Sequence, residues 1–117
     1  MLFIEYPKCS TCQKAKKWLD ANGVDYIDRH IKDDHPTYDE LRQWYERSGL
    51  PLKSFFNTGG MLYRELKLKD RLPSMSEQEQ LELLASDGML VKRPLVVTDN
   101  RIIPGFRAAE WEEKLLS

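Results

Sequence analysis

The only two cysteines of this chain, Cys9 and Cys12, lie three positions apart and directly after the short apolar run Leu2–Ile4. A strand that ends in a loop containing Pro7 and then enters a helix places the free N–H groups of the first helical turn beside these thiols. Such N–H groups stabilise a thiolate, and C-x-x-C pairs at helix N-termini have pKa values lowered from about 8.5 to between about 3.5 and 7.5. The arrangement predicts redox or nucleophilic chemistry at a strand-to-helix junction.

The length of 117 residues fits one domain that buries roughly two-thirds of its unfolded surface without disulfides. The net charge of −1 does not favour nucleic acid as a direct partner, and no apolar run approaches the roughly 18 residues of a membrane span. Two thiols in one motif, with no cysteine elsewhere, fit a reducing compartment better than a disulfide framework. We therefore expect one domain over residues 1–117, located in the cytoplasm.

Three segments carry the end signals of helices, with Ser or Thr at the start, Glu or Gln three positions later, and glycine at the end. The predicted helices begin with the capping pairs Ser10–Gln13, Thr37–Glu40 and Ser76–Glu79, and they end at Gly23, Gly49 and Gly88. A fourth helix is expected at about 108–116. Apolar side chains repeat at helical spacing in each, so these helices are expected to pack on a core.

Strands are predicted at 1–6, 25–29, 95–98 and 101–103, and the last two flank Asp99-Asn100, a two-residue turn. Strand, helix, strand at the N-terminus implies a parallel pair with a right-handed crossover, and strand, strand, helix at the C-terminus adds an antiparallel pair. The stretch from about 37 to 88 has no strong strand signal and is interpreted as a helical insertion. This is an α/β layout, a thioredoxin-like fold with a mixed four-stranded sheet and a helical insertion between its β-α-β and β-β-α halves.

Three separated motifs occur in an order that closely resembles the ArsC/Spx family. They are the cysteine segment at 6–19, the segment 57–66 that begins Asn-Thr-Gly and ends Tyr-Arg-Glu-Leu, and the Lys-Arg-Pro-Leu-Val-Val segment at 92–97. The family comprises glutaredoxin-linked arsenate reductases and Spx-type redox regulators that bind RNA polymerase. The resemblance covers essentially the whole chain and implies the same thioredoxin-like sheet with a helical insertion.

The resemblance places Cys9 at the family's nucleophile position. Cys12 lies in the first helical turn, close enough in such motifs to close a short disulfide with Cys9, and is the candidate resolving thiol. Family reductases usually have serine at the position of Cys12, whereas Spx-type members keep the cysteine. Lys8 and Ser10 flank the nucleophile and are candidate substrate-binding residues, and the charge of Lys8 would further stabilise a thiolate. The alternative is that both thiols are small buried apolar side chains.

A thiolate that reduces an oxyanion also needs fixed positive charge, and a guanidinium binds tetrahedral oxyanions bidentately. By resemblance, Arg93 supplies an anion-binding contact beside a cis Pro94 that faces the nucleophile, and Arg107 is the second active-site arginine. Asn57 stands where arsenate reductases have a third arginine; it can hydrogen-bond an anion but brings no charge, and Arg64 is a nearby substitute. The alternative for Arg93 and Arg107 is that they are solvated surface cations.

A zinc site is a further alternative, because His30 and His35 follow the cysteine pair. The 17 residues between Cys12 and His30 hold an amphipathic helix and a strand, and the two histidines bracket a loop rather than share a helix. We therefore expect no metal.

These observations predict a thiol–disulfide oxidoreductase that resembles arsenate reductase, holds no bound cofactor, and acts on a small oxyanion or disulfide substrate. The adduct on Cys9 would be resolved by Cys12, by glutathione with glutaredoxin, or by thioredoxin. The alternative is an Spx-type regulator in which the cysteine pair is a redox switch and the RNA polymerase alpha subunit is the partner. A third alternative is a protein of the same fold with vestigial thiols.

Overall fold

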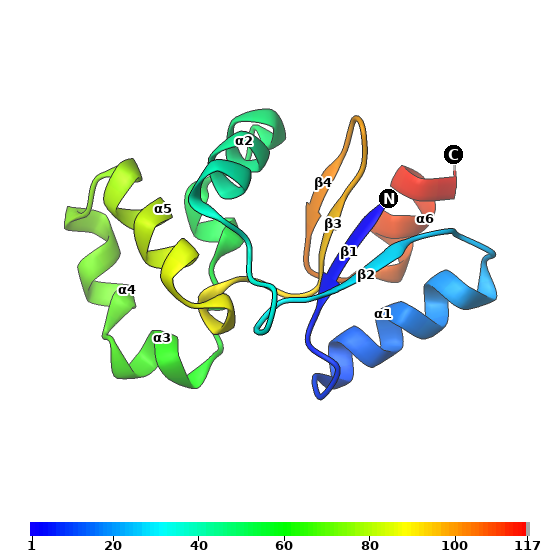
Figure 1. Ribbon diagram of the computed structural model, residues 1–117, viewed down its shortest axis with the longest axis horizontal. Coiled ribbons are helices and arrows are strands. Elements are labelled where there is room, and N and C mark those ends of the chain that lie inside the picture. Colours follow the sequence, from blue (N-terminus) through cyan, green and yellow to red (C-terminus); the bar gives the residue numbers. More distant parts are fainter. Residues whose placement is uncertain (117) are drawn as a thin grey trace.

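The computed structural model describes residues 1–116 and contains a mixed four-stranded sheet (Figure 1). Its strands are β1 (Leu2–Glu5), β2 (Ile27–His30), β3 (Leu95–Val97) and β4 (Ile102–Pro104), in the order β2-β1-β3-β4. β1 is parallel to β2 and antiparallel to β3, and β3 is antiparallel to β4. The predicted α/β architecture, with β-α-β and β-β-α halves, is confirmed.

The parallel pair is joined by α1 (Ser10–Ala21), which buries Cys12, Ala15 and Leu19. In this pair Leu2 lies opposite Ile27 and Glu5 opposite His30, so β2 begins two residues later than the predicted strand at 25–29. A backbone hydrogen bond from the N–H of Ile27 to the carbonyl of Met1, 2.8 Å long, fixes this register.

The antiparallel pair β3–β4 turns at Asp99-Asn100, as predicted. The N–H of Thr98 donates to the carbonyl of Arg101 over 2.8 Å, which leaves two residues in the turn. The hydroxyl of Thr98 accepts hydrogen bonds from the N–H groups of Asn100 and Arg101. This side chain satisfies the turn's donors, so the turn forms without glycine.

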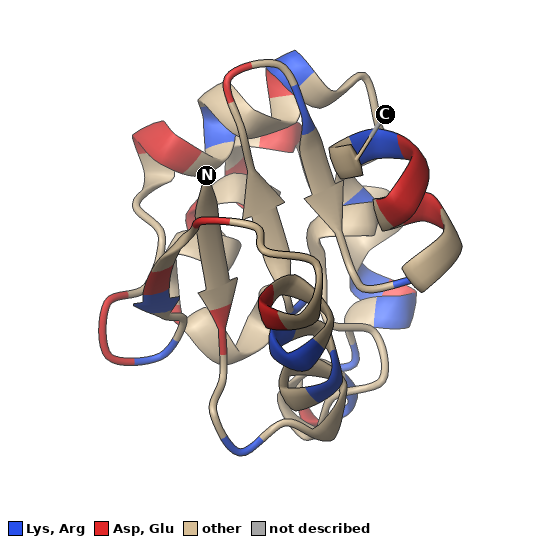
Figure 2. Ribbon diagram, turned by 90° about the vertical axis from the view of Figure 1, so that its right-hand side faces the viewer, with Lys and Arg blue, Asp and Glu red and all other residues tan. Residues whose placement is uncertain are grey.

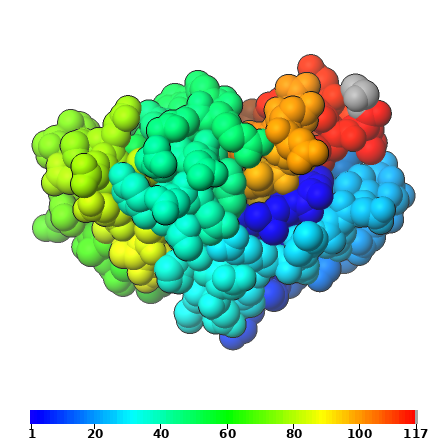
Figure 3. Space-filling model, turned by 45° about the horizontal axis from the view of Figure 1, so that its top comes forward, coloured from blue at the N-terminus to red at the C-terminus, as the bar shows by residue number. Residues whose placement is uncertain are grey.

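The chain between β2 and β3 consists of helices joined by loops, with one isolated bridge, Phe56–Val91. It lies on the left in Figure 1, and Figure 3 shows its green and yellow surface beside the sheet half of the molecule. Its elements are α2 (Tyr38–Ser48), η1 (Leu52–Phe55), α3 (Met61–Glu65), α4 (Leu68–Arg71), η2 (Leu72–Ser74), α5 (Glu77–Ser86) and η3 (Gly88–Leu90). One further helix, α6 (Ala108–Leu116), follows β4.

Two of the three predicted capping boxes form. Thr37 accepts from the N–H of Glu40, whose carboxylate accepts from the N–H of Thr37, and Ser76 and Glu79 make the same pair. The prediction of a capping box at Ser10 is wrong. The residue that caps α1 is Cys9, which has extended backbone angles, and Gln13 instead donates through its side chain to the carbonyl of Pro7 over 3.0 Å. The chain enters α1 from the Pro7 loop, and Ser10 therefore already lies inside the helix.

The prediction that the helix beginning at Ser76 ends at Gly88 is also inaccurate. α5 ends at Ser86, Asp87 is extended, and the carboxylate of Asp87 accepts from the N–H of Met89 to start η3. Gly88 is required for close approach instead, because a Cβ atom there would collide with the backbone carbonyl of Ile31.

Two apolar clusters lie on opposite faces of the sheet, because successive side chains of a strand point to opposite sides. Ile4 packs in the larger cluster, against the helices between β2 and β3, and Phe3 packs in the smaller one with α1 and α6. The positions of Lys, Arg, Asp and Glu along the ribbon lie mainly in the helices and in the loops (Figure 2). Among residues 1–116, Glu5 is the one buried charged side chain.

Candidate active site

Cys9 is held at the N-terminus of α1 by backbone hydrogen bonds to residues on both sides of it in the sequence. After β1 ends at Glu5, the chain turns so that the N–H of Cys9 donates to the carbonyl of Tyr6 over 2.9 Å. The carbonyl of Cys9 accepts the first helical hydrogen bond, from Gln13 over 3.0 Å. The side chain of Cys9 is half-buried, and the first turn of α1 contains no acidic residue. The thiol therefore faces the positive end of the helix.

Burial acts to raise the pKa of the Cys9 thiol, but hydrogen bonds to the sulfur outweigh it, so the pKa lies below its ordinary value. The donors are the backbone N–H and the thiol of Cys12, the side chain of Arg93 and the backbone N–H of Thr11. These groups bind the charged sulfur more strongly than the neutral one. Cys9 is thereby favoured as a thiolate.

Cys12 behaves in the opposite way. It is 1% exposed, and burial, opposed by a backbone hydrogen bond with Tyr6, combines with the negative charges of Cys9 and Glu5 to raise its pKa to about 12. The protonated Cys12 donates to the Cys9 sulfur. The two thiols therefore form an asymmetric pair, in which the half-buried Cys9 has the lowered pKa and the buried Cys12 has the raised pKa.

Arg93 approaches the pair from the loop before β3. Its side chain hydrogen-bonds the Cys9 sulfur, and its guanidinium lies 5.3 Å from the centre of the Tyr6 ring. The peptide bond between Arg93 and Pro94 is cis, and the buried Pro94 accepts from the N–H of Gly105 over 2.8 Å. The pairing of β3 with β1 thus brings Arg93 to Cys9 across more than 80 positions of the sequence.

Asn57 lies near this loop. Its N–H donates to the carbonyl of Leu90 over 2.7 Å, and the N–H of Lys92 donates to the carbonyl of Phe55 over 2.8 Å. These bonds hold Asn57 beside the chain that leads to Arg93. Its side chain packs close to Gly60.

The structure places Arg107 and Arg64 in two separate depressions, neither of which is the cavity that Cys12 lines. Arg107 is exposed and lines a basic depression of about 430 Å³ together with Lys53, Lys92 and Lys114. Arg64 is exposed on α3 and lines a smaller one that also contains Lys67, Lys69 and Asp70. Within residues 1–116, the lining of neither depression includes a cysteine or Arg93.

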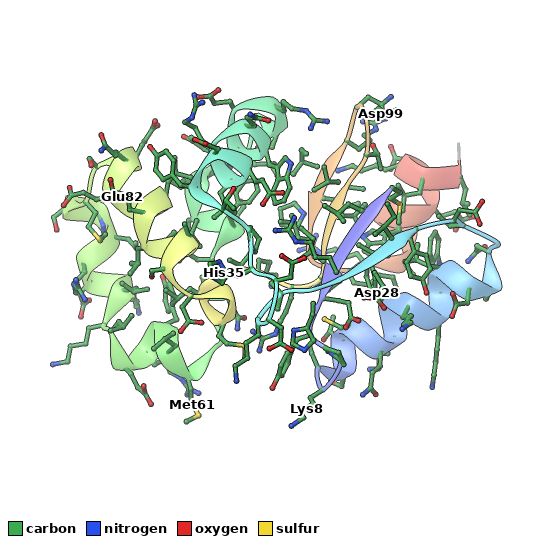
Figure 4. The ribbon with its side chains drawn as sticks, in the orientation of Figure 1. Lys8, Asp28, His35, Met61, Glu82 and Asp99 are labelled. Atoms are coloured by element: carbon green, nitrogen blue, oxygen red, sulfur yellow. The ribbon has the colours of Figure 1, made fainter. Side chains whose placement is uncertain are left out.

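Lys8 and Ser10 flank Cys9 and are both exposed. Figure 4 shows Lys8 at the tip of the loop before α1, with its side chain pointing away from the body of the molecule. Ser10 is the first residue of α1 and does not cap it.

The sequence analysis missed Glu5. This residue is 4% exposed and lines a cavity of about 330 Å³ whose wall is formed by Pro7, Cys12, Gln13, Lys16, Asp28 and His30. Burial, then a hydrogen bond to Asp28 and repulsion by its charge, raise the pKa of Glu5 to about 7. The sequence signal that could have revealed Glu5 is the alternation of side chains along a strand. Glu5 is the last residue of an apolar strand and lies on the same face as Phe3, which predicts that it is buried.

Comparisons with known proteins give relatives over almost the whole chain. A model of the ArsC family matches residues 4–114. The protein YusI of Bacillus subtilis (strain 168) is 55% identical over 113 residues, which are 97% of this chain and 96% of YusI. An ArsC family related protein from Bacteroides fragilis has a crystal structure that superposes with a TM-score of 0.93 at 58% identity, covering 96% and 94% of the two chains.

Further relatives carry two kinds of description. A protein of Streptococcus mutans UA159 described as a possible arsenate reductase has 52% identity and a TM-score of 0.85, over 91% of this chain and 90% of its own. The regulatory protein MgsR of Bacillus subtilis (strain 168) is 28% identical over 94% of this chain and 86% of its own. The global transcriptional regulator Spx of Staphylococcus epidermidis is 27% identical over 89% and 78%. These matches confirm the thioredoxin-like fold of the ArsC type.

In the described part of the chain, no three His, Cys, Asp or Glu side chains gather as metal ligands. No helix over residues 1–116 is both long enough and apolar enough to cross a membrane.

Proposed function

The chain belongs to the ArsC family, and from this premise we propose that it is a thiol–disulfide oxidoreductase resembling arsenate reductase. The observation that carries the proposal is the asymmetry of the thiol pair. Cys9 is half-buried at a helix N-terminus with a lowered pKa, and Cys12 stays protonated beneath it. Such a pair supplies one nucleophile and one resolving thiol.

In the proposed reaction the Cys9 thiolate attacks one sulfur of a disulfide substrate, and the other sulfur leaves as a thiolate. Arg93 holds negative charge at the site of attack. Cys12 then attacks the Cys9 sulfur, which releases the second half of the substrate and leaves a Cys9–Cys12 disulfide. External thiols, supplied either by thioredoxin or by glutathione with glutaredoxin in a reducing cytoplasm, restore both thiols.

Arsenate fits the same scheme as an alternative substrate. Cys9 would bond to arsenic with loss of one oxygen as water, and attack by a second thiol would pass two electrons to arsenic and release arsenite. A small disulfide or other oxidised sulfur is favoured, because Arg93 is the one cationic group among the hydrogen-bond donors that lower the Cys9 pKa. Arg107 and Arg64 line other depressions. Lys8, Ser10 and Asn57 are the further residues proposed to contact substrate.

The test follows NADPH oxidation with thioredoxin and thioredoxin reductase, or with glutathione, glutaredoxin and glutathione reductase. Hydroxyethyl disulfide and arsenate are the two substrates, and turnover is the rate above that of each coupling system without the protein, because these systems reduce hydroxyethyl disulfide directly. We expect Cys9→Ser to abolish turnover with either, and Cys12→Ser to change only which reductant works. Turnover that survives Cys9→Ser would show the assignment of the nucleophile to be wrong.

A second candidate is a redox-dependent transcriptional regulator, favoured by the likeness to MgsR and Spx and by the C-x-x-C pair. In this case oxidation of Cys9 and Cys12 would switch binding to the RNA polymerase alpha subunit. The purified alpha subunit, tested with the diamide-oxidised and the reduced protein, discriminates the two. Binding that needs oxidation and is lost in Cys9→Ser favours the regulator, and its absence together with turnover favours the enzyme.

A further inference from the structure

We propose that Glu5 accepts the proton of Cys12 when Cys12 attacks the intermediate on Cys9, and returns it when the disulfide is reduced. The proposal rests on the proposed thiol exchange at Cys9. It adds to that exchange a proton acceptor for Cys12.

Burial and a shared cavity place Glu5 beside Cys12. β1 turns Glu5 toward α1, on the same face as Phe3, and leaves it 4% exposed. Glu5 and Cys12 line one cavity of about 330 Å³ between β1, β2 and α1. Figure 4 labels Asp28 on β2, near α1. A cavity of this size and polarity has room for water that can carry a proton between the two groups.

The chemistry requires such an acceptor. Cys12 has a pKa of about 12, so very little of it is thiolate near neutral pH, and its proton must leave as it attacks. A general base works best when its own pKa lies near the working pH. The pKa of Glu5, about 7, meets this condition, whereas that of an ordinary carboxylate does not.

Four groups face Glu5 from the elements packed against it. From β2, Asp28 hydrogen-bonds to Glu5 and raises its pKa, and His30 lies opposite Glu5 in the strand register. From α1, Lys16 pairs with Asp28 over 2.9 Å and lowers the pKa of Glu5, and Cys12 shares the cavity. Asp28 raises the pKa of Glu5 and Lys16 lowers it. Substitutions at these two neighbours can therefore shift the pKa of Glu5 in either direction while Glu5 itself is kept.

The step balances as follows. The Cys12 proton passes to the Glu5 carboxylate, and a bond forms between the sulfur atoms of Cys12 and Cys9. The bond from Cys9 to the substrate sulfur breaks, and the substrate half leaves as a thiolate. The disulfide substrate is reduced and the cysteine pair is oxidised. On reduction by an external thiolate, Cys12 is the leaving group and takes the proton back from Glu5.

Ellman's reagent separates the two steps because Cys9 and Cys12 are the only thiols. Stopped-flow absorbance at 412 nm shows one thionitrobenzoate released when Cys9 attacks, at a rate proportional to reagent concentration. A second is released when Cys12 attacks the mixed disulfide, at a rate independent of it. In the wild type we expect the second rate to rise with pH through an inflection near 7. In Cys12→Ser the second phase is absent.

Glu5→Gln keeps the size of the side chain and removes the acceptor. We expect the second phase to slow about a hundredfold or more and to lose the inflection near 7, while the first phase persists as proof of a folded protein with a reactive Cys9. Glu5→Asp retains the inflection. Glu112→Gln, on the exposed side of α6, is the matched control and changes neither phase.

Two further variants test the proposal with Glu5 in place. Asp28→Asn removes the negative charge by which Asp28 raises the pKa of Glu5, while burial still raises it, so the inflection moves part of the way to lower pH. Lys16→Met removes a charge that lowers this pKa and moves the inflection to higher pH. The role of Glu5 would be overturned by an unchanged second phase in Glu5→Gln, or by an inflection at the same pH in wild type, Asp28→Asn and Lys16→Met. Either result would leave the proposed function standing. Absence of the first phase in the wild type would instead remove the proposed function itself.

Discussion

The guanidinium of Arg93 lies over the ring of Tyr6, with its Cζ atom 5.3 Å from the ring centre. The carbonyl of the same Tyr6 accepts the N–H of Cys9 over 2.9 Å. One residue thus positions both the nucleophile and the cation that stabilises it. Met89 adds a second support, since its carbonyl accepts from Arg93 over 3.4 Å.

Replacing Arg93 by methionine should raise the pKa of Cys9, because a hydrogen-bonding cation that favours the thiolate is lost. We expect iodoacetamide alkylation at pH 7 to slow several-fold, measured in a Cys12→Ser background so that one thiol reacts. Arg64→Met is the matched control, since Arg64 is exposed on α3. Equal alkylation profiles for the two arginine variants would contradict the contact between Arg93 and the thiol.

Glu5 should make the protein less stable as pH rises. The folded pKa of about 7 exceeds the ordinary value of 4.5, so the unfolded chain releases its proton first and the free energy of unfolding falls between these two pH values. The loss is about 3 kcal/mol, since each tenfold difference in proton affinity is worth about 1.4 kcal/mol. Urea unfolding at pH 4.5 and pH 8 measures it, and Glu5→Gln should remove most of the difference. If the free energy of unfolding changes equally between pH 4.5 and pH 8 in the wild type and in Glu5→Gln, Glu5 is not the group responsible.

Gly88→Ala should destabilise the fold by roughly 3 kcal/mol, because the new Cβ atom would collide with the carbonyl of Ile31 and move either η3 or the end of β2. Gly59→Ala is the matched control, because a Cβ there meets nothing within 4 Å and the backbone is not left-handed. Thermal unfolding of the two variants should show a lowered midpoint for Gly88→Ala alone. Similar midpoints would contradict the close approach.

Ser76→Ala should cost about 1 kcal/mol, since it removes the side-chain acceptor of the capping box at the start of α5. Ser10→Ala should change stability by less than about 0.5 kcal/mol, because Ser10 lies inside α1 and caps nothing. Chemical denaturation of both variants compares the two serines directly. A larger loss at Ser10 would favour the cap expected from the sequence over the one observed.

The sequence by itself determined the elements whose cause is local. Thr37 and Ser76 reach their Glu partners three residues on, and the turn at Asp99-Asn100 closes through neighbouring groups. Both the strand-to-helix junction at Cys9 and the order of strands and helices followed from such short-range signals. Ser10 is the exception, since the Pro7 loop moved the cap of α1 to Cys9.

Only the tertiary structure decided which side chains meet at the thiols. The pairing of β3 with β1 brings Arg93 to Cys9, and among the described residues the linings of the depressions that contain Arg107 and Arg64 include neither cysteine. The packing of α1 on β1 encloses Glu5 beside Cys12 and shifts both pKa values. Burial and electrostatic coupling depend on distances through space between segments far apart in the chain, and sequence spacing does not encode those distances.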